Sequence, residues 1–199
     1  RALTPDVDRA LTAAVAQLDD LLVRTGLRLL RATGMRMGEL LDLELDCLLD
    51  FAGHGVWLRV PVGKLNSERV VPLEPDIVAI IDTWIAQRGR QRALPHPRHG
   101  RPTEFLFLEH GRRPTSFRLR KGLIDAVAAA NLRGRDGNLL HITPHQLRHT
   151  FGTSLINGGI GLPALMALMG HVTPEMTLRY AKLASPIIRS AYQAAMDKA

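Results

Sequence analysis

The stretch TPHQLRHT, residues 143–150, carries the signals that begin a helix. Thr143 is a favourable N-cap residue, Pro144 suits the first helical position, and Gln146 stands where a capping box needs it. Because the three signals agree in register, we predict a helix that begins directly after Thr143.

One face of this predicted helix gathers polar and cationic groups. At 100° per residue His145, Arg148, His149 and Gly152 lie on the same side, and the glycine leaves room for a ligand. His145 lies in the first turn, where backbone N–H groups favour an anion. A guanidinium binds two phosphate oxygens at once and keeps its charge, so phosphate is the ligand that we expect.

Two other interpretations of this face are open. It is consistent with a solvated basic surface, and His145 and His149 also have the i, i+4 spacing of zinc proteases, with His141 nearby. A zinc site of that kind needs a third ligand and usually a carboxylate beside the first histidine. Gln146 occupies that place, and Arg148 would put a cation beside the metal.

Apolar residues at helical spacing predict a fold that is α+β and mainly α-helical. Further helices are expected near residues 7–14, 18–33, 36–45, 77–85, 116–130, 163–169 and 173–180, with a last amphipathic helix after Pro186. Residues 90–104 are rich in Arg, Pro and His, and we expect a polar loop that is ordered only on binding.

Residues 48–73, which lie between the predicted helices, have a different hydrophobic pattern. Val56, Leu58 and Val60 alternate along the chain, and a glycine-containing turn follows them. Alternation of this kind is typical of a strand with one buried face. We therefore predict a small antiparallel sheet near residues 48–73, with Lys64 at its tip.

Composition limits the possible classes of protein. The 199 residues suffice for one good core, and a net charge of +7 with a pI near 10.5 favours a polyanionic partner. The single cysteine, Cys47, excludes an intrachain disulfide and a thiolate metal cage, and we expect it to be buried. No apolar run reaches the roughly 18 residues of a membrane span, and no signal peptide is recognisable. Since the chain starts at Arg1, we expect it to be part of a longer protein.

Three further segments carry groups that suit phosphate chemistry. TGMRMGEL contains Arg36, GKLNSERVVPL contains Lys64, and LMGHVTPEMTLRY contains His171 and Tyr180. Each has an ordinary explanation when taken singly. Arg36 can pair with Glu39, the lysine can be a solvated turn residue, the histidine can cap a helix, and the tyrosine can lie at the edge of the core.

Taken in order, these residues resemble the tyrosine recombinase (phage integrase) family. The family pattern is Arg, Lys, His-x-x-Arg, His or Trp, then Tyr, and the matching residues here are Arg36, Lys64, His145, Arg148, His171 and Tyr180. The resemblance extends from about residue 4 to residue 184. Gly38 and Ser67 replace residues that are frequently Ser and Lys in the family, and neither change removes a reacting group.

The resemblance implies the catalytic fold of DNA breaking-and-rejoining enzymes and a single catalytic domain over residues 1–199. It implies that the N-terminal core-binding domain of the family is absent from this chain. The expected activity is site-specific recombination of double-stranded DNA, with Tyr180 as the nucleophile and no metal or ATP. We expect a homotetramer at synapsis, a monomer for the isolated domain, no membrane contact, and a cytoplasmic, nucleoid-associated location in a prokaryote.

Roles for the six residues follow from the same resemblance. Arg36 and Arg148 would clamp the scissile phosphate, and His171 would donate a further hydrogen bond. His145 would help to remove the proton of the nucleophile, and Lys64 would protonate the leaving 5′-hydroxyl. Two alternatives are a type IB topoisomerase or telomere resolvase, which keeps this chemistry, and a DNA-binding module without catalysis.

Overall fold

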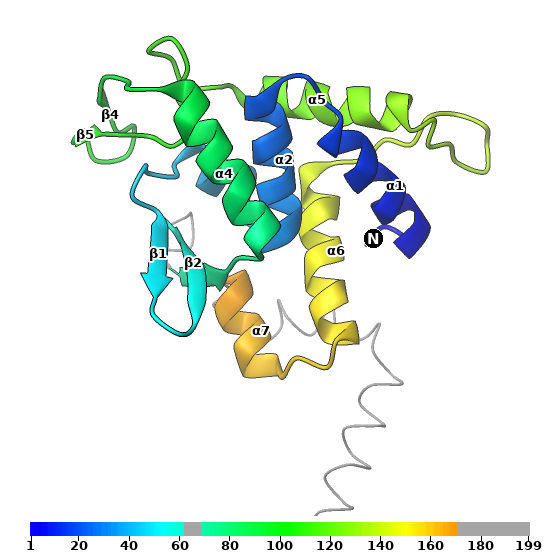
Figure 1. Ribbon diagram of the computed structural model, residues 1–199. Helices are drawn as coiled ribbons and strands as arrows, with labels where there is room; N and C mark the ends of the chain where they lie inside the picture. The colour runs from blue at the N-terminus through cyan, green and yellow to red at the C-terminus, as the bar shows by residue number, and fades with distance from the viewer. Residues whose placement is uncertain (62–68, 171–199) are drawn as a thin grey trace, which may run out of the picture.

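A computed structural model describes residues 1–61 and 69–170 (Figure 1). The elements in chain order are α1 (Pro5–Ala16), α2 (Leu21–Thr33), α3 (Met37–Leu41), β1 (Leu48–Phe51), β2 (Gly55–Val60), β3 (Arg69–Pro72), α4 (Pro75–Arg88), β4 (Leu94–Pro95), β5 (Pro102–Thr103), α5 (Ser116–Ala129), α6 (Pro144–Asn157) and α7 (Leu162–Met169). Among the described residues, no helix is both long and apolar enough to cross a membrane.

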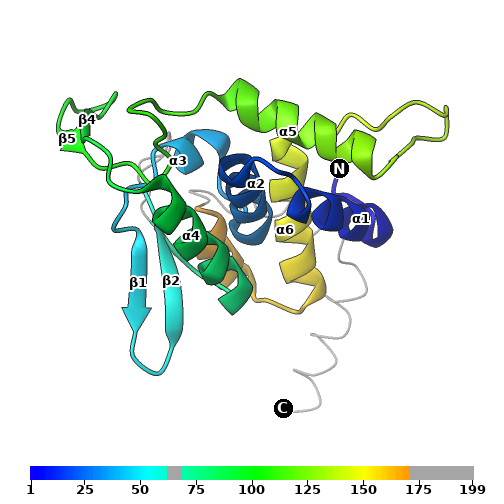
Figure 2. The same ribbon diagram turned by 45° about the horizontal axis from the view of Figure 1, so that its top comes forward.

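Helix α2 is the centre of the core. Its neighbours are α1, α4, α5 and α6, so its side chains are covered from several directions (Figures 1 and 2). Leu22, Leu27, Leu29 and Leu30 are each 1% exposed or less. Full burial of a leucine side chain contributes about 1.5–3 kcal/mol, so this one helix supplies a large share of the apolar stabilisation. Asp20 caps its start by accepting a hydrogen bond from the Val23 amide.

The α6 helix begins as the sequence predicts. Thr143 accepts a hydrogen bond from the Gln146 amide at 3.3 Å, and the Gln146 side chain accepts one from the Thr143 amide at 3.0 Å. Pro144 is the first helical residue. The capping box and its boundary are therefore confirmed.

A close contact joins α6 to the end of α2. Gly34 ends α2 in the left-handed region at φ 60°, and a Cβ atom built there would lie 2.3 Å from Cδ1 of Phe151. Glycine is thus required twice at this position, for its backbone conformation and for the approach of the phenyl ring. The contact brings the end of α2 against α6.

The predicted antiparallel sheet is present. Strands β1, β2 and β3 lie in that order, with Leu48 opposite Leu58 and Leu58 opposite Val71. Leu58 and Val60 are fully buried, as their alternation predicts. Lys64, expected at the tip between β2 and β3, lies outside the described residues.

The helix predicted near residues 36–45 is shorter than expected, because α3 ends at Leu41. Beyond it, the backbone pairs with a distant segment: the Leu45 amide donates to the Glu104 carbonyl at 2.7 Å, and the Leu106 amide donates to the Leu43 carbonyl at 2.8 Å. The apolar run from Phe105 to Leu108 is completely buried beside it. Tertiary pairing therefore replaces the last helical turn.

The segment at 90–104 also differs from the expectation of a loop ordered only on binding. Strands β4 and β5 pair in it, and the rings of His96 and His99 stack with centroids 4.0 Å apart. Arg98 forms an ion pair with Asp42 at 2.8 Å. These contacts give the segment a structure of its own.

The packing of α5 on α2 yields a test of the fold. A Cβ atom at Gly122 would lie 2.1 Å from Cγ1 of Val23, a β-branched side chain with little freedom to move. We expect Gly122→Ala to lower the free energy of unfolding by about 1–3 kcal/mol through overpacking, as measured by chemical denaturation.

Gly38→Ala is the matched control, because nothing lies within 4 Å of a Cβ atom at that helical position. It should keep or raise stability, by up to about 1 kcal/mol. Equal losses from both substitutions would contradict the described contact between the two helices.

Candidate anion-binding site

Arg148 is a buried cation on α6, with 4% of its surface exposed. Its guanidinium donates to the Gly34 carbonyl and, at 2.6 Å, to the Met169 carbonyl. Both carbonyls lie at helix C-termini, where backbone oxygens lack intrahelical partners and the helix dipole is negative. The solvated basic face considered from the sequence is therefore wrong for this residue.

Arg36 stands immediately before α3 and is held by Glu39. The Glu39 carboxylate accepts from the Arg36 amide at 2.7 Å and from its guanidinium at 2.8 Å. The same carboxylate accepts from the guanidinium of Arg69 at 2.8 Å, and Arg69 also donates to the Leu168 carbonyl. One carboxylate thus fixes two arginines from different elements.

The charge state of Glu39 follows from its surroundings. Burial by itself raises the pKa of this carboxyl, since only 2% of its surface is exposed. Hydrogen bonding and the charge of Arg69, with further hydrogen bonds from Arg36, outweigh burial and lower the pKa below its ordinary value. Glu39 is therefore a carboxylate at neutral pH, and its two partners stay oriented.

Arg36, His145 and Arg148 line a single hollow of about 710 Å³, although they come from different parts of the chain. The Arg36 side chain is 32% exposed and His145 is exposed, so both are accessible to a ligand. Three of the six predicted residues are thus brought together. Lys64, His171 and Tyr180 lie outside the described residues.

Sequence reasoning missed the part that Arg69 plays in this site. The local signal is a charged residue followed by the apolar Val70 and Val71 of a strand, which alone does not reveal its partner. Gly152 is buried on α6, and the room that it was expected to leave for a ligand stays a prediction. Cys47 is buried as expected, and burial raises the pKa of its thiol to about 12.

The zinc interpretation receives no geometric support. The rings of His145 and His149 lie edge to face with centroids 5.3 Å apart. Within residues 1–61 and 69–170, no group of three or more His, Cys, Asp or Glu side chains is arranged to hold a metal ion.

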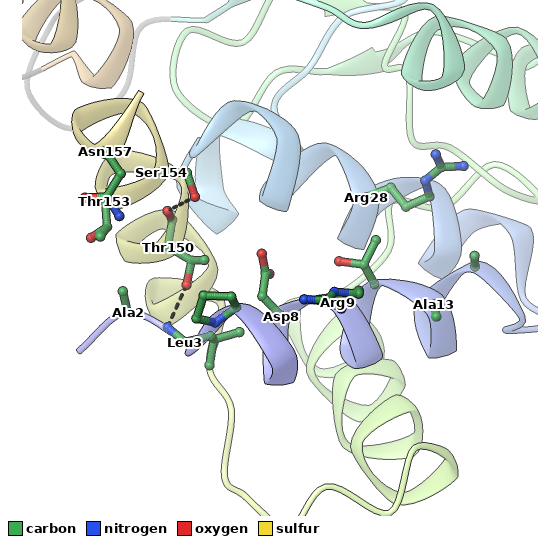
Figure 3. Close-up of a pocket in the computed structure, with 13 residues that line it drawn as sticks. Ala2, Leu3, Asp8, Arg9, Ala13, Arg28, Thr150, Thr153, Ser154 and Asn157 are labelled. Carbon is green, nitrogen blue, oxygen red and sulfur yellow. Dashed lines mark hydrogen bonds between the residues drawn. The ribbon is translucent and has the colours of Figure 1, made fainter. Parts of the chain in front are cut away.

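A second hollow, of about 780 Å³, lies between α1 and the C-terminal half of α6 (Figure 3). Thr150, Thr153 and Ser154 contribute hydroxyl groups to its wall. These residues lie on a different face of α6 from His145 and Arg148. Although this hollow is slightly larger, the buried and oriented cations lie in the other one, so chemistry rather than size identifies the candidate site.

The fold and the site together define a mainly helical domain with a cationic hollow suited to an anion. The phage integrase family model matches residues 1–185, and the chain belongs to this family. It is 35% identical over 170 residues to the tyrosine recombinase XerD of Staphylococcus haemolyticus, covering 85% of this chain and 52% of that protein. The chain therefore spans about half the length of such relatives.

Solved structures agree on the fold. The integrase of the Tn1549 transposon, in complex with circular intermediate DNA, matches with a TM-score of 0.65 and 26% identity, over 90% of this chain and 62% of that one. The catalytic domain of bacteriophage HP1 integrase matches with a TM-score of 0.62 and 22% identity, over 96% of this chain and 93% of that one. The predicted fold class is confirmed.

Glu39 provides a test of the site's architecture. Glu39→Gln removes the buried charge that neutralises its arginine partners, so we expect the free energy of unfolding at pH 7 to fall by about 3–5 kcal/mol. A carboxyl whose folded-state pKa is depressed contributes stability above its unfolded pKa, about 4.3, and loses it as the pH falls through the folded value. In chemical denaturation between pH 7 and pH 3, the free energy of unfolding of the unsubstituted protein should therefore fall with acid. This fall should be smaller in Glu39→Gln.

Asp125→Asn is the control, since that exposed carboxylate pairs with Lys121 one turn away on α5. It should cost about 0.5 kcal/mol or less. If Glu39→Gln proves equally mild, the ion-paired cluster contributes little to holding Arg36.

Proposed function

We propose that this chain is the catalytic domain of a tyrosine-type site-specific DNA recombinase, which cleaves and rejoins strands through a 3′-phosphotyrosyl bond at Tyr180. The observation that carries the proposal is the shared hollow of Arg36, His145 and Arg148. Membership of the phage integrase family supports it, as do relatives named as tyrosine recombinases and a related integrase solved with DNA.

The two arginines are suited to bind the scissile phosphate. Attack on a phosphodiester passes through five-coordinate phosphorus, which places extra negative charge on the non-bridging oxygens. Preorganised cations aimed at those oxygens are the largest available source of rate, because they need no rearrangement as charge develops. Arg148 is held by two carbonyls and Arg36 by Glu39, so both side chains are oriented before DNA arrives.

The remaining roles concern protons. A free phenol has a pKa of about 10, so only about 0.1% is ionised at neutral pH. We assign His145 to help remove the proton of Tyr180, a contribution of roughly 10²–10⁴-fold for general-base work. Lys64 would protonate the departing 5′-hydroxyl, and His171 would donate a hydrogen bond to the phosphate.

Rejoining needs no external energy under this proposal. The phosphotyrosyl bond conserves the energy of the broken phosphodiester, and a new 5′-hydroxyl attacks it to release the tyrosine. The reaction then proceeds without ATP, and the arginines supply the charge that a metal would otherwise provide.

The domain arrangement and partners belong to the same proposal. Residues 1–199 would form a single catalytic domain that acts on double-stranded DNA as part of a homotetramer, inside a prokaryotic cell at the nucleoid. Coverage of about half of a bacterial recombinase and of most of an integrase catalytic domain supports this division.

Trapping of the covalent intermediate tests the nucleophile. The full-length protein, incubated with a nicked suicide substrate that carries its recombination site, should form a protein–DNA adduct that survives denaturing electrophoresis. Tyr180→Phe removes the attacking oxygen and should abolish the adduct. Tyr192→Phe, which changes the other tyrosine of the chain, should leave it intact. An adduct formed by Tyr180→Phe would refute the assignment.

A modified leaving group tests Lys64. Lys64→Ala should slow cleavage of ordinary DNA by about 10²–10⁴-fold, the scale of a lost general acid. DNA with a 5′-bridging phosphorothiolate has a leaving group that needs no proton, so the variant should cleave it at nearly the wild-type rate. If the thiolate substrate gives no rescue in single-turnover assays, Lys64 is not the proton donor.

A further inference from the structure

Arg69, the first residue of β3, is a buried cation that lies outside the candidate site. Its side chain is 4% exposed, and it does not line the hollow that contains Arg36 and Arg148. The guanidinium donates to the Glu39 carboxylate through Nη2 and to the Leu168 carbonyl through Nε, both at 2.8 Å. Arg69 therefore reaches the site through other groups and does not face a ligand itself.

Stability alone does not account for a cation at this position. Its third nitrogen, Nη1, is buried and has no hydrogen-bond partner within the described residues. A buried polar group without a partner costs about 1–3 kcal/mol. Apolar side chains of similar volume are often neutral or stabilising in place of a buried ion pair. Because the position holds the more costly group, we expect the guanidinium to serve the site.

Arg69 and Arg148 bind neighbouring carbonyls in the last turn of α7. Arg148 donates to the Met169 carbonyl at 2.6 Å, one residue after the Leu168 carbonyl that Arg69 binds. Carbonyls at the end of a helix lack partners within the helix and are free to accept these bonds. The two guanidinium groups, which come from β3 and α6, are thus held against the same helix end.

A second set of contacts links these arginines through Arg36. Arg148 also donates to the Gly34 carbonyl, two residues before Arg36 in the chain. Arg36 and Arg69 bind the two different oxygens of the Glu39 carboxylate. The contacts therefore form a closed ring, from Arg148 through Arg36, Glu39 and Arg69 and back to Arg148 at the end of α7. Each member is held from two sides, so the ring restricts how far the arginines can move apart.

We propose that Arg69 is a positioning residue for strand cleavage, which holds the guanidinium groups of Arg36 and Arg148 at the separation that one phosphate needs. The inference rests on the proposed function, in which both groups bind non-bridging oxygens of the same phosphorus. Their separation then determines whether both can bind at once. A displacement of about 1 Å can slow a reaction by about 100-fold, so a residue that never touches DNA can control the rate.

Arg69→Lys tests the proposal, because it keeps the charge and removes the planar fork. An ammonium is a compact charge, which we expect to reach the Glu39 carboxylate or the Leu168 carbonyl but not to hold both. In the full-length protein, cleavage of the nicked suicide substrate at saturating DNA should slow by about 10- to 100-fold. The Kd for the same DNA should change by less than about threefold, since many phosphate contacts determine it.

Arg88→Lys is the matched control. Arg88 is another buried arginine, 9% exposed, and it donates to the Phe105 carbonyl at 3.1 Å without lining the hollow. This substitution should destabilise the protein and leave the cleavage rate of the folded protein unchanged. All rates are measured at a temperature at which circular dichroism shows each variant to be folded.

A double-mutant cycle tests the route through Arg36. If Arg69 acts by holding Arg36, its substitution should matter less once that partner is gone. The loss of rate caused by Arg69→Lys should therefore be at least about threefold smaller in an Arg36→Ala background than in the unsubstituted protein. An equal loss in both backgrounds would show a general structural effect and overturn the proposal.

Titration with inorganic phosphate gives a readout that needs no activity. His145 lines the hollow, so its ring resonances report binding by NMR in the full-length protein. Arg69→Lys should weaken phosphate binding by about 3- to 10-fold, the effect of one misplaced hydrogen bond, whereas Arg88→Lys should not weaken it.

The proposal is also overturned by an unchanged cleavage rate or an unchanged phosphate affinity in Arg69→Lys. If that variant is unfolded, Arg69→Gln is measured in the same way, and failure of both to fold would assign Arg69 to stability and overturn the proposal. Adduct formation by the unsubstituted protein is scored separately. Phosphate binding that depends on Arg69 without an adduct refutes the recombinase proposal alone, and an adduct without dependence on Arg69 refutes this inference alone.

Discussion

The buried guanidinium of Arg148 is the interaction on which the arrangement of this domain depends. A charged group inside a protein is costly unless it is paired or hydrogen-bonded, and here the partners are backbone carbonyls at the ends of α2 and α7. Those oxygens have no partner within their own helices, so the arginine supplies the hydrogen-bond donor that each oxygen lacks, and each oxygen supplies an acceptor for the buried guanidinium. Arg148 of α6 therefore connects the C-terminal ends of α2 and α7.

Glu39 connects further elements near Arg148 through a network of ion pairs. It is one of the least exposed charged residues in the described part of the chain, and it binds Arg36 beside α3 and Arg69 at the start of β3. Arg69 continues to the Leu168 carbonyl in α7. Helices and sheet are therefore connected through charged groups as well as through apolar packing. Removal of Glu39 would take away the carboxylate partner of the buried Arg69 guanidinium, which is costly.

The features that local sequence determines were the ones that could be predicted. The start of α6 follows from Thr143, Pro144 and Gln146, and the alternation in β2 follows from its one buried face. Features that depend on contacts distant in sequence could not be predicted. Leu43 and Leu45, beyond the early end of α3, pair with the segment at 104–106, and Arg98 in the β4–β5 segment pairs with Asp42.

The same distinction applies to the site. Arg36 and Arg148 were found from their place in an ordered series of motifs, whereas Arg69 was missed. Its role arises only in the folded chain, because Glu39 and the Leu168 carbonyl, with which it pairs, are 30 and 99 residues away in the sequence. The apolar face of α5 that exposes Phe117 and Ile124 was missed for a related reason. Helical spacing identified the helix, but spacing alone cannot tell which of two apolar faces the core covers.

Arg36 and Arg69 share the Glu39 carboxylate and Arg148 is held by backbone carbonyls, so these four side chains together carry a surplus of two positive charges. A phosphodiester at rest carries one negative charge and so compensates half of that surplus. In the proposed reaction a second negative charge develops as phosphorus becomes five-coordinate. These four groups therefore match the charge of the transition state better than that of the bound ground state, which is the condition for binding energy to accelerate a reaction.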